Sequence, residues 1–261
     1  MDYLVICVSS LIASGMTFFS GFGLGTILTP VFALFFPVAT AVAMTAVVHL
    51  ANNLLKVGIV GRDADFHVVL RFGFPAAVTS IVGAALLTWV SALAPWYTYE
   101  FMGRAHEITP VKASIGVVIA TFALLELSPA FARMAFSPRW LPVGGLMSGF
   151  FGGLSGNQGA LRSAFLVKAG LSKASYVGTS AVCAVVVDIA RIAVYSFALY
   201  FSWAKQLDLH AGIAVGAATL SAFLGTLVGK RLLKKITMRT VELTVALLMV
   251  MMGGALAGGL T

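Results

Sequence analysis

The chain alternates long apolar stretches with short polar connections. The apolar stretches cover approximately residues 4–36, 39–60, 68–93, 111–127, 141–170, 175–204, 210–233 and 241–260. An unbroken helix of about 20 apolar residues spans a hydrocarbon core of about 30 Å. The pattern therefore predicts an all-α polytopic membrane protein with about eight hydrophobic segments. Because no connection is long enough to join separate domains, we expect residues 1–261 to form a single transmembrane domain.

Two of these stretches are interrupted by glycine-rich segments, 20–25 (SGFGLG) and 155–159 (SGNQG). As one continuous helix, the stretch 4–36 would be about 50 Å long, which exceeds a single span. Folding at the glycines would convert it into a hairpin of two shorter helices. Paired glycine-interrupted segments in the two halves of a chain also indicate the binding site of a secondary transporter.

A shift of 135 residues aligns the two halves of the chain. In both halves a glycine break is followed by a helix that carries a hydroxyl residue near its start and a polar-x-x-basic pair further along. This order of features predicts two repeats, residues 1–127 and 138–261. The shift pairs Ser20 with Ser155, Gly21 with Gly156, Thr45 with Ser180, Asn53 with Asp188 and Lys56 with Arg191.

The basic residues of the connections indicate how the broken stretches cross the membrane. There are 14 of them once Lys56, Arg162 and Arg191, which lie inside apolar stretches, are left aside. If each broken stretch crosses once, nine lie on one side of the membrane and five on the other. If both are hairpins, eleven lie on one side and three on the other. The positive-inside rule favours the hairpins, so each repeat is a hairpin plus three transmembrane helices, the repeats are inverted, and both termini lie outside. The eleven are Arg62, Arg71, Arg133, Arg139, Lys168, Lys173, Lys230, Arg231, Lys234, Lys235 and Arg239; the three are Arg104, Lys112 and Lys205.

Composition excludes several classes of protein. Sixty per cent of the residues are hydrophobic and 10% are charged, against roughly a quarter charged in soluble domains. The net charge of +8 comes from basic residues scattered at the ends of apolar stretches, which indicates membrane orientation and not a nucleic-acid partner. Nucleotide-binding glycine motifs are absent and the two cysteines lie in apolar runs, so we expect no cofactor, metal or disulfide.

The glycine breaks favour an anionic substrate, since they free backbone amides and allow close approach of a ligand. Arg162 follows the second break, and its planar fork suits a tetrahedral oxyanion. A purely structural pair with Asp188 is the alternative. Thr45 and Ser180 bind either the ligand or their own helix backbone. The predicted substrate-binding residues are Arg162, Asn157, Gln158, Gly21, Gly23, Gly25, Gly156, Gly159, Asn53, Thr45 and Ser180.

Asp188 and Arg191 lie three residues apart on one helical face, as a coupling site or a structural ion pair. Asp188 is the best proton carrier if transport is proton-coupled. Lys56 either belongs with them or snorkels to the cytoplasmic face. His49 lies in the same region, but no second histidine or carboxylate stands at ligand spacing, so no metal site is expected.

The run from Gly21 to Pro30 (GFGLGTILTP), followed by Pro37 and then Ala43-Met44-Thr45, resembles the TauE/SafE family of membrane transporters, often called sulfite exporters. The second half repeats the layout. The resemblance implies transport of a small sulfur-containing anion such as sulfite, sulfoacetate or a related organosulfonate.

The sequence therefore predicts a multi-pass secondary transporter that exports sulfite or an organosulfonate across the bacterial inner membrane by alternating access. A passive anion channel is the main alternative. An intramembrane transferase would need a nucleophile or metal cluster, and no enzyme activity is expected. The expected partners are the small anion and the lipid bilayer. The particular anion, the direction, the coupling ion and the oligomeric state, including a homodimer, stay open.

Overall fold

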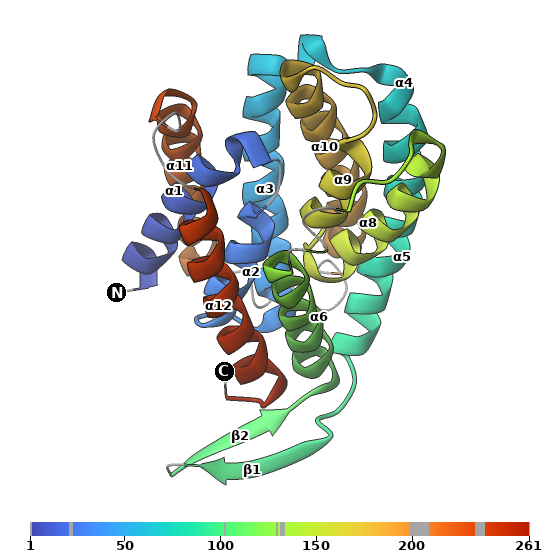
Figure 1. The fold of residues 1–261 in the computed structure, drawn as a ribbon. Coiled ribbons are helices and arrows are strands. Elements are labelled where there is room, and N and C mark those ends of the chain that lie inside the picture. The colour runs from blue at the N-terminus through green and yellow to red at the C-terminus, as the bar shows by residue number, and fades with distance from the viewer. Residues whose placement is uncertain are drawn as a thin grey trace.

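The computed structural model describes residues 2–20, 23–101, 103–128, 130, 134–198, 209–232 and 238–260. Helices run lengthwise through one elongated bundle, and a β-hairpin lies at one end of it (Figure 1). The helices are α1 (Asp2–Ser20), α2 (Leu24–Ala33), α3 (Val38–Val60), α4 (Phe66–Val68), α5 (Phe74–Ser91), α6 (Pro110–Leu127), α8 (Leu141–Ser155), α9 (Gly159–Leu166), α10 (Lys173–Ala198), α11 (Leu209–Leu232) and α12 (Met238–Ala257). Three short segments, Gly61–Asp63, Val69–Gly73 and Pro138–Trp140, complete the helical structure.

Four of the described helical segments are long and apolar enough to cross a membrane: Val38–Asp63, Phe66–Ser91, Lys173–Ala198 and Leu209–Lys230. Shorter apolar helices cover Asp2–Thr17, Leu24–Ala33 and Pro110–Leu125. The predicted helical class is therefore confirmed, and the several apolar helices indicate a protein that crosses its membrane more than once.

Both glycine-rich segments interrupt their helices, as the sequence predicts. Before the first break α1 ends, and α2 begins after Gly23, whose φ is 114°. Before the second break α8 ends at Ser155, and Gly156 follows with φ 84°. Residues with a Cβ rarely adopt such positive φ angles, which explains a glycine at each of these two positions. Gly21 lies outside the described residues.

The helix before each glycine break, α1 or α8, packs against a helix from the other half of the chain. Between α1 and α11, a Cβ added to Gly15 would lie 3.1 Å from the carbonyl oxygen of Gly225. Between α8 and α5, a Cβ added to Gly149 would lie 2.0 Å from the carbonyl oxygen of Ala76. Small residues let membrane helices approach at backbone distance, so these glycines fix the two arms against the bundle.

The segment 94–110, expected as a plain connection, contains an antiparallel hairpin of β1 (Tyr97–Phe101) and β2 (Arg104–Ile108), with Tyr97 opposite Ile108. Its aromatic residues favour strands, and Gly103, with φ 73°, supplies the turn. The Tyr99 hydroxyl donates to the carbonyl of Gly258, so the hairpin lies beside the end of α12 (Figure 1).

Candidate functional site

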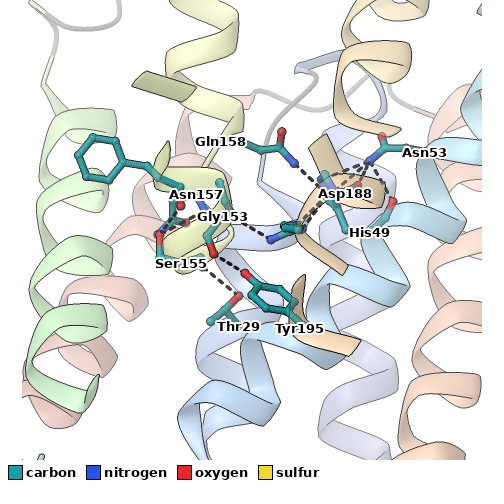
Figure 2. A network of polar contacts seen from close by, with 12 residues as sticks. Thr29, His49, Asn53, Gly153, Ser155, Asn157, Gln158, Asp188 and Tyr195 are labelled. Atoms are coloured by element: carbon teal, nitrogen blue, oxygen red, sulfur yellow. Dashed lines mark hydrogen bonds and ion pairs between the residues drawn. The ribbon is translucent and has the colours of Figure 1, made fainter. Parts of the chain in front are cut away.

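The buried carboxylate of Asp188, on α10, gathers polar groups from both halves of the chain (Figure 2). From α3, His49 Nδ1 lies 2.7 Å from Asp188 Oδ2, and Asn53 Nδ2 donates to the same oxygen at 3.4 Å. On the other side, Gln158 Nε2 and Arg191 Nε each donate to Oδ1 at 3.0 Å. Arg191 completes an ion pair with Oδ1 at 2.8 Å. A fully buried carboxylate needs such partners, because leaving its charge unpaired in a membrane is costly.

No carboxylate stands at ligand spacing from His49 in the sequence, but the fold brings Asp188 into contact with it. His49 and Asp188 are 139 residues apart in the chain, so no local spacing could reveal their contact. Within the described ranges, no three His, Cys, Asp or Glu side chains gather as a metal site would require. His49 is therefore a partner of Asp188.

Arg162 is tied to this cluster through Gln158. Its NH1 group donates to Gln158 Oε1 at 3.1 Å, and its Nε donates to Ser180 Oγ at 2.9 Å. Gln158 in turn donates to Asp188, so it bridges the cation and the acid. The structure thus brings together three predicted site residues, Arg162, Gln158 and Ser180. The hydroxyl of Ser180 accepts from the guanidinium, which positions Arg162 beside the second break.

Two further buried cations in the described part of the chain, Arg191 and Lys56, reach the carbonyl ends of the interrupted helices. Arg191 NH1 donates to the carbonyl of Gly152 at 2.9 Å, and Lys56 Nζ donates to that of Thr17 at 3.3 Å. The carbonyl of Gly152 also accepts from the N–H of Gly156 at 3.0 Å, so Arg191 is a second donor to it. Cations near the last carbonyls of a helix meet the favourable end of the helix dipole. Lys56 is only 5% exposed, so the expectation that it could snorkel to a membrane face is wrong. Both cations cap a helix end.

Tyr195 was not anticipated as part of the site. Its hydroxyl donates to the carbonyl of Gly153, next to the carbonyl held by Arg191 (Figure 2). Arg191 and Tyr195 are four residues apart and share a face of α10. The spacing was visible in the sequence, but the carbonyls that these side chains hold belong to another helix.

The two glycine breaks meet inside the bundle. A Cβ on Gly25, at the start of α2, would lie 2.8 Å from the carbonyl oxygen of Gly156. The same Cβ would lie 3.9 Å from His49 Cδ2, so the contact is adjacent to the Asp188 cluster. Thr29 Oγ1 donates to the carbonyl of Ser155 at 3.5 Å (Figure 2). Two segments far apart in sequence therefore form one buried junction.

Several polar atoms at this junction are buried without a hydrogen-bond partner among the described residues. They include Oδ1 and Nδ2 of Asn157 and the hydroxyl oxygen of Thr45. Thr45 lies one helical turn before His49, on the face of α3 that also carries Asn53. Buried polar groups are nearly always bonded, so these atoms have capacity for a ligand. Gly159, another predicted site residue, begins α9 next to Gln158.

A polytopic helical bundle in which two interrupted helices meet beside buried cations and amides is the architecture of a membrane transport protein. The chain matches the family described as Sulfite exporter TauE/SafE over residues 6–256. It belongs to this family, whose members are transporters and not enzymes. A search of curated proteins returned no match.

Proposed function

We propose that this protein exports a small sulfur-containing anion, sulfite or an organosulfonate, across the bacterial inner membrane. The family supplies the class of substrate. The observation that carries the proposal is the close approach of Gly25 to Gly156, since a Cβ added to Gly25 would lie 2.8 Å from the carbonyl oxygen of Gly156. The buried Arg162 belongs to the helix that follows this break. Glycines let an anion approach the backbone closely, and the buried cation attracts its charge. A transporter needs such a site to bind its substrate on one side of the membrane and release it on the other.

The donors near the junction match the oxygens of a sulfite or sulfonate group. The guanidinium of Arg162 is 2% exposed and is oriented by Gln158 and Ser180. Asn157 adds a carboxamide without a partner in the described part of the chain. Charge-assisted hydrogen bonds from a guanidinium are stronger than neutral ones, so Arg162 is the main anion contact and Asn157 a neutral one.

We further propose that the two halves are inverted repeats that move against each other during alternating access. The shift of 135 residues takes Lys56 to Arg191 and Thr17 to Gly152, and in both halves the cation caps that carbonyl. The equivalent helices α3 and α10 run in opposite directions, since the end of α3 lies beside the start of α10. There a Cβ on Gly178 would be 2.4 Å from the carbonyl oxygen of Val60. Both observations support an inverted pair.

The orientation follows from the basic residues. The end of the bundle where α3 ends and α10 begins, uppermost in Figure 1, carries most of them among the described residues. The positive-inside rule makes that end cytoplasmic, which leaves both termini outside. An anion leaving a cell with a negative interior gains roughly 2.3 kcal/mol per charge per 100 mV, so export needs no coupling ion. The basic positions at this end include Arg62, Arg71, Arg139, Lys168 and Lys173, against Arg104 and Lys112 near the β-hairpin.

Two measurements on the purified protein test the proposal. Sulfite, thiosulfate, sulfate and short sulfonates are screened for thermal stabilisation, because a ligand that binds the native state raises its stability. Counterflow in proteoliposomes then distinguishes a carrier from a channel. Only a carrier transiently accumulates labelled anion inside vesicles that were preloaded with the unlabelled anion. We expect stabilisation and counterflow with at least one sulfur anion. Stabilisation by none, or flux without counterflow, would contradict the proposal.

A further inference from the structure

Lys56 carries a buried charge that its contact with a helix end does not neutralise. Its ammonium is 5% exposed, and among the described residues its hydrogen bond is to the carbonyl of Thr17, at 3.3 Å. Thr17 in turn lies at the first glycine break, because its Cγ2 is 2.7 Å from the position of a Cβ on Gly23. The charge of Lys56 therefore lies beside the break.

Arg191, the equivalent cation of the second half, has a carboxylate partner, whereas Lys56 has none among the described residues. Arg191 has Asp188 three residues before it, at 2.8 Å. At the corresponding place before Lys56 stands Asn53, a neutral residue whose amide donates to the carbonyl of His49 and to Asp188. Asp188 is the buried acid in the described part of the chain, and it pairs with Arg191 and His49. No carboxylate within the described ranges pairs with Lys56.

A second observation at the same place points to a ligand. Asn52 precedes Lys56 by one helical turn and is fully buried. Its Oδ1 accepts from Thr226 at 2.7 Å and from Ser14 at 3.2 Å, but its Nδ2 has no partner among the described residues. A donor without an acceptor thus lies one turn from a cation without a carboxylate. An anion at this position would satisfy both.

Arg162 and Lys56 lie on the two sides of the Asp188 cluster. Asn53, three residues before Lys56, donates to Asp188 Oδ2, and Gln158, which accepts from Arg162, donates to Asp188 Oδ1. Two like charges buried near each other in a membrane repel, and a negative charge between them removes that repulsion.

We propose that Lys56, with the amide of Asn52, is a second anion-binding position, so that the substrate is held between Lys56 and Arg162 and a divalent oxyanion is preferred. This inference rests on the proposed function, because it requires that the protein bind a small oxyanion. It assigns Lys56 to binding in addition to its contact with Thr17. A doubly charged anion balances both cations, whereas a singly charged one leaves an excess buried charge.

The experiment compares sulfate with methanesulfonate, which share a sulfonyl head and differ by one charge. Binding to the purified full-length protein is measured by titration and thermal stabilisation. In the wild type, sulfate binds more tightly. Lys56→Met should weaken sulfate binding at least about tenfold and reduce the preference for sulfate, while Lys56→Arg should keep both. Lys168→Met, at an exposed position, is the control and should bind both anions as the wild type does.

Further outcomes separate binding from capping. Because Lys56→Met removes a buried charge that has no carboxylate partner, the ligand-free variant should melt no lower than the wild type. Wild-type affinity for sulfate in Lys56→Met, or an unchanged preference, would overturn the proposal. If neither Lys56→Met nor Lys56→Gln folds, Lys56 is a structural cap alone and the proposal is likewise overturned. Failure of the wild type to bind any anion would instead refute the proposed function itself, so the two failures are distinguishable.

Discussion

Asn53 and Asp188 contact each other, with Asn53 Nδ2 donating to Asp188 Oδ2 at 3.4 Å, and they are 135 residues apart. The shift of 135 residues places them at corresponding positions in the two proposed repeats. In such a pair of repeats, contact between corresponding residues occurs where the axis relating the repeats passes between them. Only one residue of this pair is an acid, and the amide of the other helps to hold it. The polar cluster is therefore asymmetric in charge.

The first prediction concerns the junction of the breaks. Gly25→Ala should abolish transport, because the new Cβ would lie 2.8 Å from the carbonyl oxygen of Gly156 and force the breaks apart. We expect a loss of stability of about 1–3 kcal/mol from overpacking. The matched control is Gly58→Ala on α3, where nothing lies within 4 Å and transport should persist. Flux assays and thermal melts measure both, and normal flux in Gly25→Ala would contradict the junction's role.

Gly23 and Gly156 are less informative targets than Gly25. Both have positive φ, so any side chain strains the backbone whatever the ligand requires. Loss of transport in Gly23→Leu or Gly156→Leu is expected. Its interpretation depends on whether the variant still folds, as judged by its melting profile.

Arg162 is expected to dominate anion affinity. Arg162→Lys keeps the charge but loses the fork that Gln158 and Ser180 orient, so affinity for the best anion should fall at least about tenfold, or 1.4 kcal/mol. Arg162→Ala should eliminate stabilisation by the anion altogether. Exposed Arg139 supplies the control, since Arg139→Ala should bind normally. Unchanged anion stabilisation in Arg162→Ala would remove this residue from the site.

Arg191 should be needed for stability and not only for binding. Arg191→Leu leaves the buried Asp188 without its guanidinium partner and removes the side-chain donor to the carbonyl of Gly152, and breaking a buried pair costs about 3–5 kcal/mol. Adding Asp188→Asn removes the unpaired charge and should recover part of the loss. Unfolding of the single and double variants gives their interaction energy. Additive effects would show that the two charges do not stabilise each other.

The orientation predicts that both termini are periplasmic. Reporter fusions at Thr261 and within residues 230–239 should report opposite sides of the membrane, with the loop in the cytoplasm. The reason is the concentration of basic residues on the loop side. A fusion at Thr261 that reports the cytoplasm would show that the hairpin topology is wrong.

The sequence alone determined the helices and the two breaks. Apolar stretches of about 20 residues specify spans because every backbone group inside a membrane must be bonded within its own helix. Glycine clusters mark interruptions because they lower the cost of leaving that helix. The same local rules missed the β-hairpin at Tyr97–Phe101 and Arg104–Ile108, since its aromatic residues also fit an apolar connection near a membrane surface.

Only the tertiary structure decided what the polar residues contact. His49 reaches Asp188, Gly25 meets Gly156, and Arg162 is linked to Asp188 through Gln158. The first two contacts join residues more than 100 positions apart, and the third depends on how the chain turns after the second break. Hydrophobic periodicity specifies which face of a helix is buried. Which buried group then faces which depends on helix packing, since the partner of a buried charge is set by its neighbours in space and not in sequence.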